Sequence, residues 1–371
     1  MDEATIAFTG GGTGGHIYPG LAVAEALRSR GFSGRIAWIG SKKGSDRETV
    51  ETAGIEFFAV PSGKLRRELS LKNVADAFRV VAGYASARRA LKSLRPVLLF
   101  SKGGYASVAP CAAAASLGIP YFTHESDITP GLATRLNARR AETTILSYEA
   151  TRGLLPASAR GRALVSGNPV RAAIRKGDAV RGRYLLGIGG SLPVVFFLGG
   201  SQGARQINDL ASAALPRLTQ SAFVVHQRGE GAQAAGSGEI PPDGPRYKSY
   251  AYIRDEMPDL LAAADLVVGR AGAGTLWESS ALGRAMLLVP LCGSGTRGDQ
   301  VDNAAYFARS GAAVALVGTE ATADRLADEA LGLLHDRRRL LAMGIAAKAL
   351  AGRDAASEIA ELILRRIGGA G

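Results

Sequence analysis

The sequence predicts an α/β protein made of two doubly wound halves that face each other across a cleft. Three observations favour this fold class. The chain has 371 residues, a length that suits two domains. Its 48 glycines suit a protein with many tight turns between strands and helices. The order of strand, glycine turn and helix occurs near the start of the chain and again after residue 194.

The first half begins with a strand at 5–9, then a glycine-rich run at 10–15 and a helix expected over 21–28. The glycines match the dinucleotide fingerprint. However, the second strand, at 36–39, is followed by Gly-Ser-Lys-Lys, without the acidic residue that holds a ribose in nicotinamide enzymes. The run is therefore interpreted as a place where bound groups approach the backbone closely.

His16 ends this glycine run. Ligands of open α/β sheets bind at the carboxyl ends of the strands, so a histidine at this point faces the expected crevice. An imidazole also titrates near neutral pH, which suits a general base. The alternative is a structural histidine of the core.

Two further strands of the first half, at 97–100 and 121–123, also end in polar or glycine clusters, Ser101–Tyr105 and His124–Asp127. Because these clusters gather on one sheet edge, they indicate one cleft. The other interpretation is that Asp127, or Thr129 just after it, caps the helix that follows.

A helix expected over 71–92 carries apolar residues at steps of three and four, surrounded by arginines and lysines. One interpretation is an ordinary amphipathic helix on a sheet. The other is a membrane-facing patch with apolar anchors and a basic rim. The anchors are Val74, Phe78, Val81 and Tyr84.

The second half follows Gly-Asn-Pro-Val-Arg at 167–171, which is interpreted as a domain junction. A strand at 194–198, a glycine turn and a helix over 207–215 repeat the order of the first half. The later strands of this half are expected at 222–226, 249–253 and 286–290.

The most informative stretch is a buried strand at 264–268, a small-residue turn at 269–274 and a helix over 276–282. Backbone N–H groups at such a helix N-terminus bind anions, so the turn suits a diphosphate. Glu278 lies one turn into the helix, where it can accept two hydrogen bonds from a ribose. Alternatively, Thr275 and Glu278 form a capping box that needs no ligand.

A net charge of +12 favours an anionic partner: nucleic acid, an anionic membrane surface or a phosphorylated substrate. No nucleic-acid-binding signature is present, so we expect a membrane surface and phosphorylated substrates. A generically basic protein is the alternative. No apolar run reaches the roughly 18 residues of a membrane span, and the acidic start resembles no signal peptide. Cys111 and Cys292 suggest a cytoplasmic protein without disulfides. No Asp-X-Asp motif occurs, so neither a metal nor a cofactor is expected.

A set of motifs in register along nearly the whole chain resembles one family. It is the MurG-type undecaprenyl-diphospho-muramoylpentapeptide β-N-acetylglucosaminyltransferases of peptidoglycan synthesis, whose GT-B fold has two Rossmann-like domains. The motifs are Gly-Gly-Thr-Gly-Gly-His with Pro19, Gly-Gly-Tyr with Ser107, His-Glu-Ser-Asp, Gly-Asn-Pro-Val-Arg, Gly-Gly-Ser-Gln-Gly-Ala-Arg, Arg-Ala-Gly-Ala with Glu278, and Asp-Gln with Asn303.

The resemblance implies an inverting enzyme that moves GlcNAc from UDP-GlcNAc to the C4 hydroxyl of MurNAc-(pentapeptide)-diphospho-undecaprenol, converting lipid I to lipid II. This activity serves cell-wall biogenesis, and with it cell shape and division, at the cytoplasmic face of the inner membrane. The expected domains are an acceptor and membrane domain at 1–166, a UDP-GlcNAc domain at 167–345 and a C-terminal helix at 346–371 that packs back on the first domain.

The resemblance also implies residue roles. His16 is the expected base, with Asp127 second. UDP-GlcNAc is expected to contact Thr13, Gly14, Gly15, His16, Asp127, Arg171, Gly200, Ser201, Gln202, Tyr252, Ile253, Arg270, Gly272, Ala273, Gly274, Thr275, Glu278, Asp299, Gln300 and Asn303. The acceptor is expected to contact Gly11, Gly12, Gly103, Gly104, Tyr105 and Glu125. The anchors named above fall on the family's membrane patch.

Two positions depart from the family pattern. Asp127 stands where Asn is common, and Asp299 where Gln is common; an amide donates a hydrogen bond and a carboxylate does not. Rival functions are another GT-B UDP-sugar enzyme, such as a diacylglycerol glucosyltransferase or a UDP-sugar epimerase, a nicotinamide oxidoreductase, and a non-catalytic nucleotide-sugar-binding protein.

Overall fold

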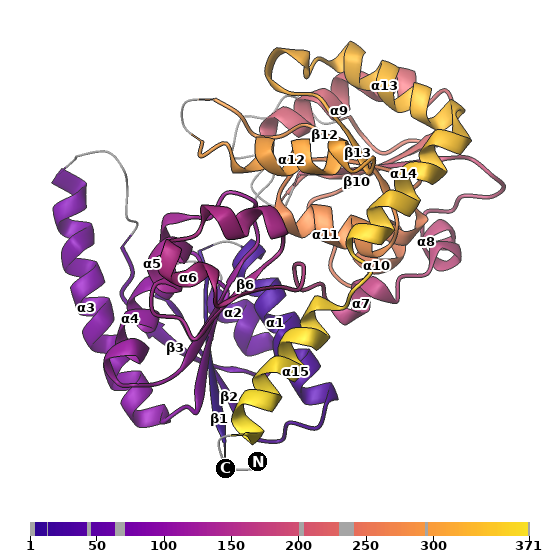
Figure 1. Ribbon diagram of the computed structural model, residues 1–371. Helices are drawn as coiled ribbons and strands as arrows, with labels where there is room; N and C mark the ends of the chain where they lie inside the picture. Colours follow the sequence, from indigo (N-terminus) through magenta and orange to yellow (C-terminus); the bar gives the residue numbers. More distant parts are fainter. Residues whose placement is uncertain are drawn as a thin grey trace. The chain divides into compact units, whose positions relative to one another are not determined.

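The structure is a computed structural model. It describes residues 4–12, 14–42, 46–63, 71–199, 204–229, 241–293 and 296–369, with the side chains of 71–78 left out. Internal contacts divide the chain into unit 1, Met1–Arg171 with Arg353–Gly371, and unit 2, Ala172–Gly352 (Figure 1). The domain limits that the sequence suggested stay predictions.

Unit 1 is built on a parallel sheet that has seven strands in the described part of the chain, in the order β3-β2-β1-β4-β5-β6-β7. Its central strands β1, β4 and β5 are short runs that the sheet buries completely, as expected for parallel strands covered on both faces. β1 lies between β2 and β4, which is the switch point of a doubly wound sheet. The strands are β1 Thr5–Thr9, β2 Arg35–Ser41, β3 Glu56–Val60, β4 Leu98–Ser101, β5 Tyr121–Glu125, β6 Thr143–Leu146 and β7 Ala163–Val165.

Helices cover both faces of this sheet (Figure 1). The last helix, α15, comes from the end of the chain and buries Ile359 and Ile363 in a core that contains Phe8 and Trp38. The helices are α1 Gly14–Ser29, α2 Asp46–Thr52, α3 Leu71–Leu94, α4 Val108–Ser116, α5 Leu132–Ala138, α6 Ala157–Arg160 and α15 Ala355–Gly368, with 3-10 turns η1 Tyr105–Ser107 and η2 Glu149–Leu154.

Unit 2 repeats the same winding on a sheet of six described strands, in the order β10-β9-β8-β11-β12-β13. β8 pairs in parallel with β9 and with β11, so the switch point lies between β8 and β11. The strands are β8 Val194–Leu198, β9 Phe223–Gln227, β10 Tyr247–Tyr250, β11 Leu266–Gly269, β12 Ala285–Leu288 and β13 Ala313–Ala315.

The helices of unit 2 pack on this sheet around a core that includes Phe197, Ile207 and Leu287. They are α7 Ala172–Arg175, α8 Ala179–Leu185, α9 Arg205–Leu218, α10 Met257–Ala263, α11 Ala273–Ala281, α12 Asp299–Arg309, α13 Ala323–His335 and α14 Arg337–Leu350, with the 3-10 turn η3 Gly318–Glu320. Among the described residues of both units, no helix is long and apolar enough to cross a membrane.

Two expected boundaries at the sheet edge of unit 1 were wrong, and in unit 2 the strand expected at 249–253 is β10, Tyr247–Tyr250. α1 begins at Gly14 rather than Leu21, and it contains Pro19. Because proline lacks an N–H donor, it usually lies at the start of a helix, but here the helix continues on its N-terminal side. β5 runs on to Glu125, so His124 and Glu125 belong to the strand and not to the loop after it.

Candidate active site

Two glycine loops meet at the carboxyl edge of the unit 1 sheet. Gly10–Gly12 follows β1 and Gly103–Gly104 follows the neighbouring strand β4. Gly104 has a φ of 76°, and a Cβ there would lie 2.7 Å from the Gly11 carbonyl oxygen and 2.8 Å from Cδ2 of His16. The two loops and His16 are therefore in close contact at the switch point, where ligands of doubly wound sheets bind.

His16 lies in the first turn of α1 rather than in a loop before the helix. Gly14 and Gly15 also belong to α1, so the glycine run is part loop and part helix N-terminus. Such an N-terminus presents backbone N–H groups and the positive end of the helix dipole. The imidazole, next to Gly104, lies at the carboxyl edge of the sheet, where the sequence analysis expected a general base.

Asp46 is a neighbour of the first glycine loop that the sequence analysis missed. Its Oδ2 accepts a hydrogen bond from the Gly12 amide at 2.8 Å, from the first turn of α2. Burial raises the pKa of this carboxyl group, and the Gly12 hydrogen bond opposes that effect. No spacing in the sequence indicated this contact, because the two residues lie on separate elements. The ring of Tyr105 also lies against Gly12, since a Cβ at Gly12 would meet its Cε1 at 2.3 Å.

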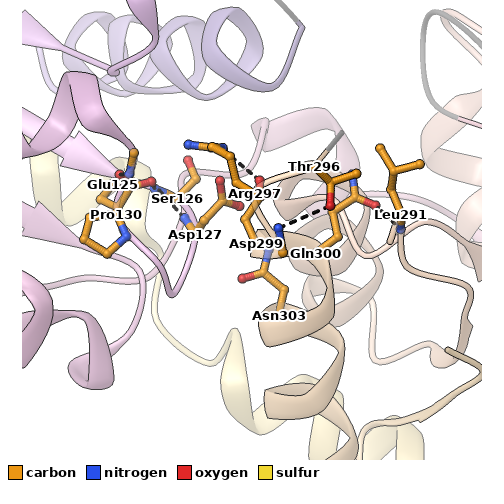
Figure 2. Close-up of polar contacts among 12 residues, drawn as sticks. Glu125, Ser126, Asp127, Pro130, Leu291, Thr296, Arg297, Asp299, Gln300 and Asn303 are labelled. Atoms are coloured by element: carbon orange, nitrogen blue, oxygen red, sulfur yellow. Dashed lines mark hydrogen bonds and ion pairs between the residues drawn. The ribbon is translucent and has the colours of Figure 1, made fainter. Parts of the chain in front are cut away.

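Glu125 holds the loop between β5 and α5. Its Oε1 accepts from the amides of Ser126 at 2.8 Å and Asp127 at 3.0 Å, and its Oε2 accepts from Gly131 at 3.0 Å (Figure 2). The carboxylate that the resemblance assigned to the acceptor thus orients its own loop. The expectation that Asp127 or Thr129 caps the next helix was wrong, because the N-cap is Gly131 and no side chain caps it.

A fully buried polar cluster joins β4, β5 and the segment after β7. Nζ of Lys102 contacts Nδ1 of His124 at 3.0 Å and the hydroxyl of Ser126, and that hydroxyl donates to Oδ1 of Asn168 at 3.1 Å. Nε2 of His124 lies 3.0 Å from the Gly167 carbonyl oxygen. The sequence analysis placed Lys102 in a loop cluster but assigned it no role. A lysine beside glycines gives no sequence signal that its side chain turns inward.

The matching edge of unit 2 is formed by the turn between β11 and α11. Gly272 is the N-cap of α11 and no side chain caps the helix, so the capping-box interpretation of Thr275 and Glu278 was wrong. Residues 272–275 and Glu278 are partly exposed. The first amides of α11 therefore lie at the surface without a side-chain cap, an arrangement that suits an anion.

Two predicted donor-site residues, Arg270 and Asn303, are held by hydrogen bonds beside this turn. Nη1 of Arg270 donates to Oε1 of Gln206 at 2.9 Å, and burial lowers the pKa of the guanidinium. Asn303 is buried and donates to the Ala271 carbonyl oxygen at 3.2 Å, which braces the start of the turn.

Gln300 and Asp299 begin α12 and are anchored nearby. Oε1 of Gln300 accepts from the Leu291 amide at 2.9 Å, and the Asp299 carboxylate pairs with Arg297 at 2.7 Å (Figure 2). Asp299, which stands where an amide is common in the family, thus forms an ion pair with Arg297.

The edge near β9 and β10 holds two further predicted donor residues, Tyr252 and Ile253. The Ile253 amide donates to Oε1 of Gln227 at 3.0 Å, and Ile253 is buried. The guanidinium of Arg254 lies over the ring of Tyr252, 5.4 Å from its centre. Gln227 was not predicted, although it ends β9 at the same sheet edge.

The remaining predicted residues include Arg171, those of the membrane patch on α3 and several that lie outside the described part of the chain. In unit 1, Arg171 lies over the ring of Tyr18 on α1, 4.8 Å from its centre. On α3, Val81 is 67% exposed, whereas Tyr84 is half-buried and packs against the core. Outside the described residues and side chains lie Thr13, Gly200, Ser201, Gln202, Val74 and Phe78.

Comparison with known proteins identifies the class. Residues 6–146 match the Glycosyltransferase family 28 N-terminal domain and residues 194–359 match the Glycosyltransferase family 28 C-terminal domain. The crystal structure of Acinetobacter baumannii MurG superposes with a TM-score of 0.71 at 25% identity, over 98% of this chain and 99% of that one. The chain is therefore a glycosyltransferase, and its two doubly wound units with glycine turns at their carboxyl edges have the GT-B fold.

Relatives identify the family. A protein of Treponema denticola is 46% identical over 96% of both chains, and one of Shouchella clausii is 40% identical over 90% of this chain and 92% of its own. Both are named UDP-N-acetylglucosamine–N-acetylmuramyl-(pentapeptide) pyrophosphoryl-undecaprenol N-acetylglucosamine transferase. The chain belongs to this family. A Staphylococcus aureus MnaA–UDP structure, at a TM-score of 0.70 and 11% identity, shares the fold alone.

Proposed function

We propose that this chain transfers GlcNAc from UDP-GlcNAc to the C4 hydroxyl of MurNAc-(pentapeptide)-diphospho-undecaprenol, with inversion at the anomeric carbon. The observation that carries the proposal is the 46% identity, over 96% of both chains, to a relative named for this reaction. The glycine loops and His16 at the unit 1 edge and the uncapped α11 turn at the unit 2 edge support it.

Unit 2 is proposed to bind the donor. The first amides of α11, which no side chain caps, suit the diphosphate, as does Arg270, which Gln206 orients. Glu278, one turn further along α11, would accept hydrogen bonds from the ribose. As the family resemblance implies, Ile253 and Tyr252 would lie beside the uracil, and Gln227 would hold the backbone at Ile253 in place.

Unit 1 is proposed to bind the acceptor. Its two glycine loops, 10–12 and 103–104, would take the acceptor diphosphate, since a backbone without side chains lets phosphate approach N–H groups closely. Tyr105, which lies against Gly12, would contact the same group. Asp46 already occupies the Gly12 amide, so the diphosphate would be held by the other amides of these loops.

The reaction is a single displacement. His16 would remove the proton of the C4 hydroxyl as its oxygen attacks C1 of GlcNAc from the face opposite UDP. The C1–oxygen bond to the diphosphate breaks, and UDP leaves with the electron pair. The α11 amides and Arg270 would stabilise the charge that develops on the diphosphate. Asp127 is the second candidate for the base.

The proposal includes peripheral association with an anionic membrane at the cytoplasmic face, because the acceptor carries a lipid. The net charge of +12 supports it. So does exposed Val81 on α3, where an apolar side chain in a basic helix can enter the interface.

The test is transfer of label from radiolabelled UDP-GlcNAc to a muramoylpentapeptide-diphospho-lipid, with UDP-glucose as the control donor. Label in the lipid from the N-acetyl sugar alone is expected. His16→Ala should lower kcat about 100-fold or more, while Asp127→Asn should retain most of the activity. Retained turnover in His16→Ala, with loss in Asp127→Asn, would transfer the role of base to Asp127.

The rival functions have separate readouts in the same assay. An epimerase would change UDP-GlcNAc without any acceptor, and a diacylglycerol glucosyltransferase would label diacylglycerol from UDP-glucose. A nucleotide-sugar-binding protein would bind UDP in calorimetry and label nothing. Any one of these results in place of transfer would refute the proposed reaction.

A further inference from the structure

We propose that Lys102 is a positioning residue of the acceptor site: its buried ammonium orients the polar cluster next to the two glycine loops and supplies a positive charge toward the acceptor diphosphate. This inference rests on the proposed function, and it adds a residue to which that function assigned no role. Lys102 is 1% exposed, so it acts through its neighbours and its field rather than by touching the substrate.

The partners of His124 determine which of its ring nitrogens donates a hydrogen bond and which accepts one. The Gly167 carbonyl oxygen accepts, so Nε2 of His124, at 3.0 Å, carries the proton. Nδ1 is then the acceptor for Nζ of Lys102, also at 3.0 Å. Burial and the Lys102 ammonium hold the pKa of His124 well below its usual value, in agreement with a neutral ring.

The hydrogen bonds of Ser126 are oriented in the same way. An ammonium group only donates, so Lys102 donates to the Ser126 oxygen, and the hydroxyl proton points to Oδ1 of Asn168 at 3.1 Å. The amide of Asn168 is thereby turned with its oxygen toward Ser126. Lys102 thus orients groups from β5 and from the segment after β7, both at the edge where the glycine loops lie.

The charge of Lys102 lies beside both loops. Lys102 directly precedes Gly103, and a Cβ at Gly10 would lie 3.1 Å from the Lys102 Cβ. A charge in the interior is screened far less than one at the surface. The negative groups nearby are partly occupied: Glu125 accepts three backbone amides. An ammonium here costs stability, which suits a functional site better than a structural one.

The protonation of Lys102 depends on groups from several elements. Burial lowers the pKa of Lys102 to about 8, and the carboxylates of Glu125 and Asp127 oppose that shift. His124 on β5 contacts it directly, His16 on α1 lies close enough to act on His124, and Asp46 on α2 binds the first glycine loop. The charge is therefore present at neutral pH and is lost as the pH rises above about 8.

The experiment measures the KM for the lipid acceptor at saturating UDP-GlcNAc between pH 7 and pH 9. Lys102→Met should raise the acceptor KM about tenfold at pH 7, with the donor KM unchanged, and Lys102→Arg should restore part of the affinity. In the wild type the acceptor KM should rise with pH, whereas in Lys102→Met it should be independent of pH. Ser126→Ala, which keeps the ammonium, should keep the pH dependence.

The control variant is Arg284→Met, which removes a partly buried cation of unit 2 that donates to the carbonyl oxygens of Leu282, Ala262 and Ala264. It should lower the melting temperature without changing the acceptor KM. If Lys102→Met behaves like this control, Lys102 is only structural and the inference is overturned.

The remaining outcomes are also decisive. If Lys102→Met does not fold, a wild-type acceptor KM that stays constant from pH 7 to pH 9 overturns the inference, and one that rises in both the wild type and Ser126→Ala supports it. If the wild type transfers no label, the proposed function fails and the inference fails with it. Normal wild-type transfer with an unchanged acceptor KM in Lys102→Met leaves the proposed function intact and overturns this inference alone.

Discussion

Single buried polar residues organise the candidate acceptor edge of unit 1. Glu125 gathers three backbone amides, Asp46 binds the Gly12 amide, and Lys102 joins His124 to Ser126. Buried polar groups are stable only when their hydrogen bonds are satisfied. These contacts therefore satisfy buried polar groups of the first glycine loop and of the β5–α5 loop within the chain itself.

The buried charge of Lys102 should make the free energy of unfolding depend on pH. Its pKa is about 8 in the folded chain against 10.5 for an exposed lysine. Between these values the unfolded chain binds more protons, so the free energy of unfolding rises with pH in this window. Below pH 8 the full cost of burying the ammonium is present. Relative to Lys102→Met, the wild type should gain about 2 to 3 kcal/mol between pH 7 and pH 10.

Urea denaturation of both proteins at the two pH values measures this gain. The comparison with Lys102→Met removes the effect of other groups, such as Cys111, whose pKa burial raises to about 12. A difference in stability that does not change with pH would show that Lys102 titrates normally.

Gly104→Ala tests the close approach of the two glycine loops. Alanine at φ 76° is strained, and its Cβ would lie 2.7 Å from the Gly11 carbonyl oxygen. We expect a loss of about 2 to 4 kcal/mol of stability, from backbone strain plus displacement of the loop, together with loss of transfer. The matched control is Gly118→Ala, with φ 68° and nothing within 4 Å, which should cost about 1 kcal/mol and leave transfer unchanged. Equal effects of the two variants would exclude a role for loop contact.

At the scale of elements, helices cover the faces of each sheet and bury its core. α15 follows α14 of unit 2 in sequence but belongs to unit 1, where Ile359 and Ile363 enter the core. The first turn of α1 presents His16 and glycines to the sheet edge, although Pro19 lies further along the same helix. In α1, tertiary packing outweighs the local signal of Pro19, since packing of an apolar face supplies most helical stability in a protein.

Ile363→Ala should therefore destabilise unit 1 by about 2 to 4 kcal/mol, because it opens a cavity at a fully buried position. The free energy of urea unfolding measures the loss. Leu341→Ala on α14, where the side chain is 66% exposed, is the control and should change stability by less than about 0.5 kcal/mol. A similar small effect at Ile363 would show that α15 is not part of the folded core.

For the whole molecule, the net charge of +12 is the property that acts beyond any one site. It attracts anionic surfaces over about one Debye length and is screened by salt. Affinity for a membrane then needs apolar contact in addition, which is the role proposed for α3.

Binding to vesicles tests whether α3 adds apolar contact to the attraction between the net charge and an anionic membrane. The chain should float with liposomes that contain anionic phosphatidylglycerol and be released by high salt, and Val81→Asp should weaken binding several-fold by placing a charge in the apolar contact. Val180→Asp on α8 of unit 2, where valine is 78% exposed, is the control and should bind like the wild type. Flotation that Val81→Asp and Val180→Asp reduce equally would mean that net charge alone drives association.

The sequence alone was sufficient for the class of fold, the order of strands and glycine turns, and the family. These depend on patterns within short segments, such as the buried runs 5–9 and 194–198 that became β1 and β8. Turn chemistry is equally local, so the glycines of residues 10–12 and 103–104 marked the edge of the sheet correctly.

Only the tertiary structure decided how the candidate site is held together. Lys102 turns inward to His124 and Ser126, and Asp46 reaches Gly12 from another helix. Burial and hydrogen-bond partners depend on which distant segments pack together, and no periodicity within a segment contains that information. A lysine beside two glycines has the same sequence pattern whether its ammonium is in water or in the interior, and only packing determines which of the two it is.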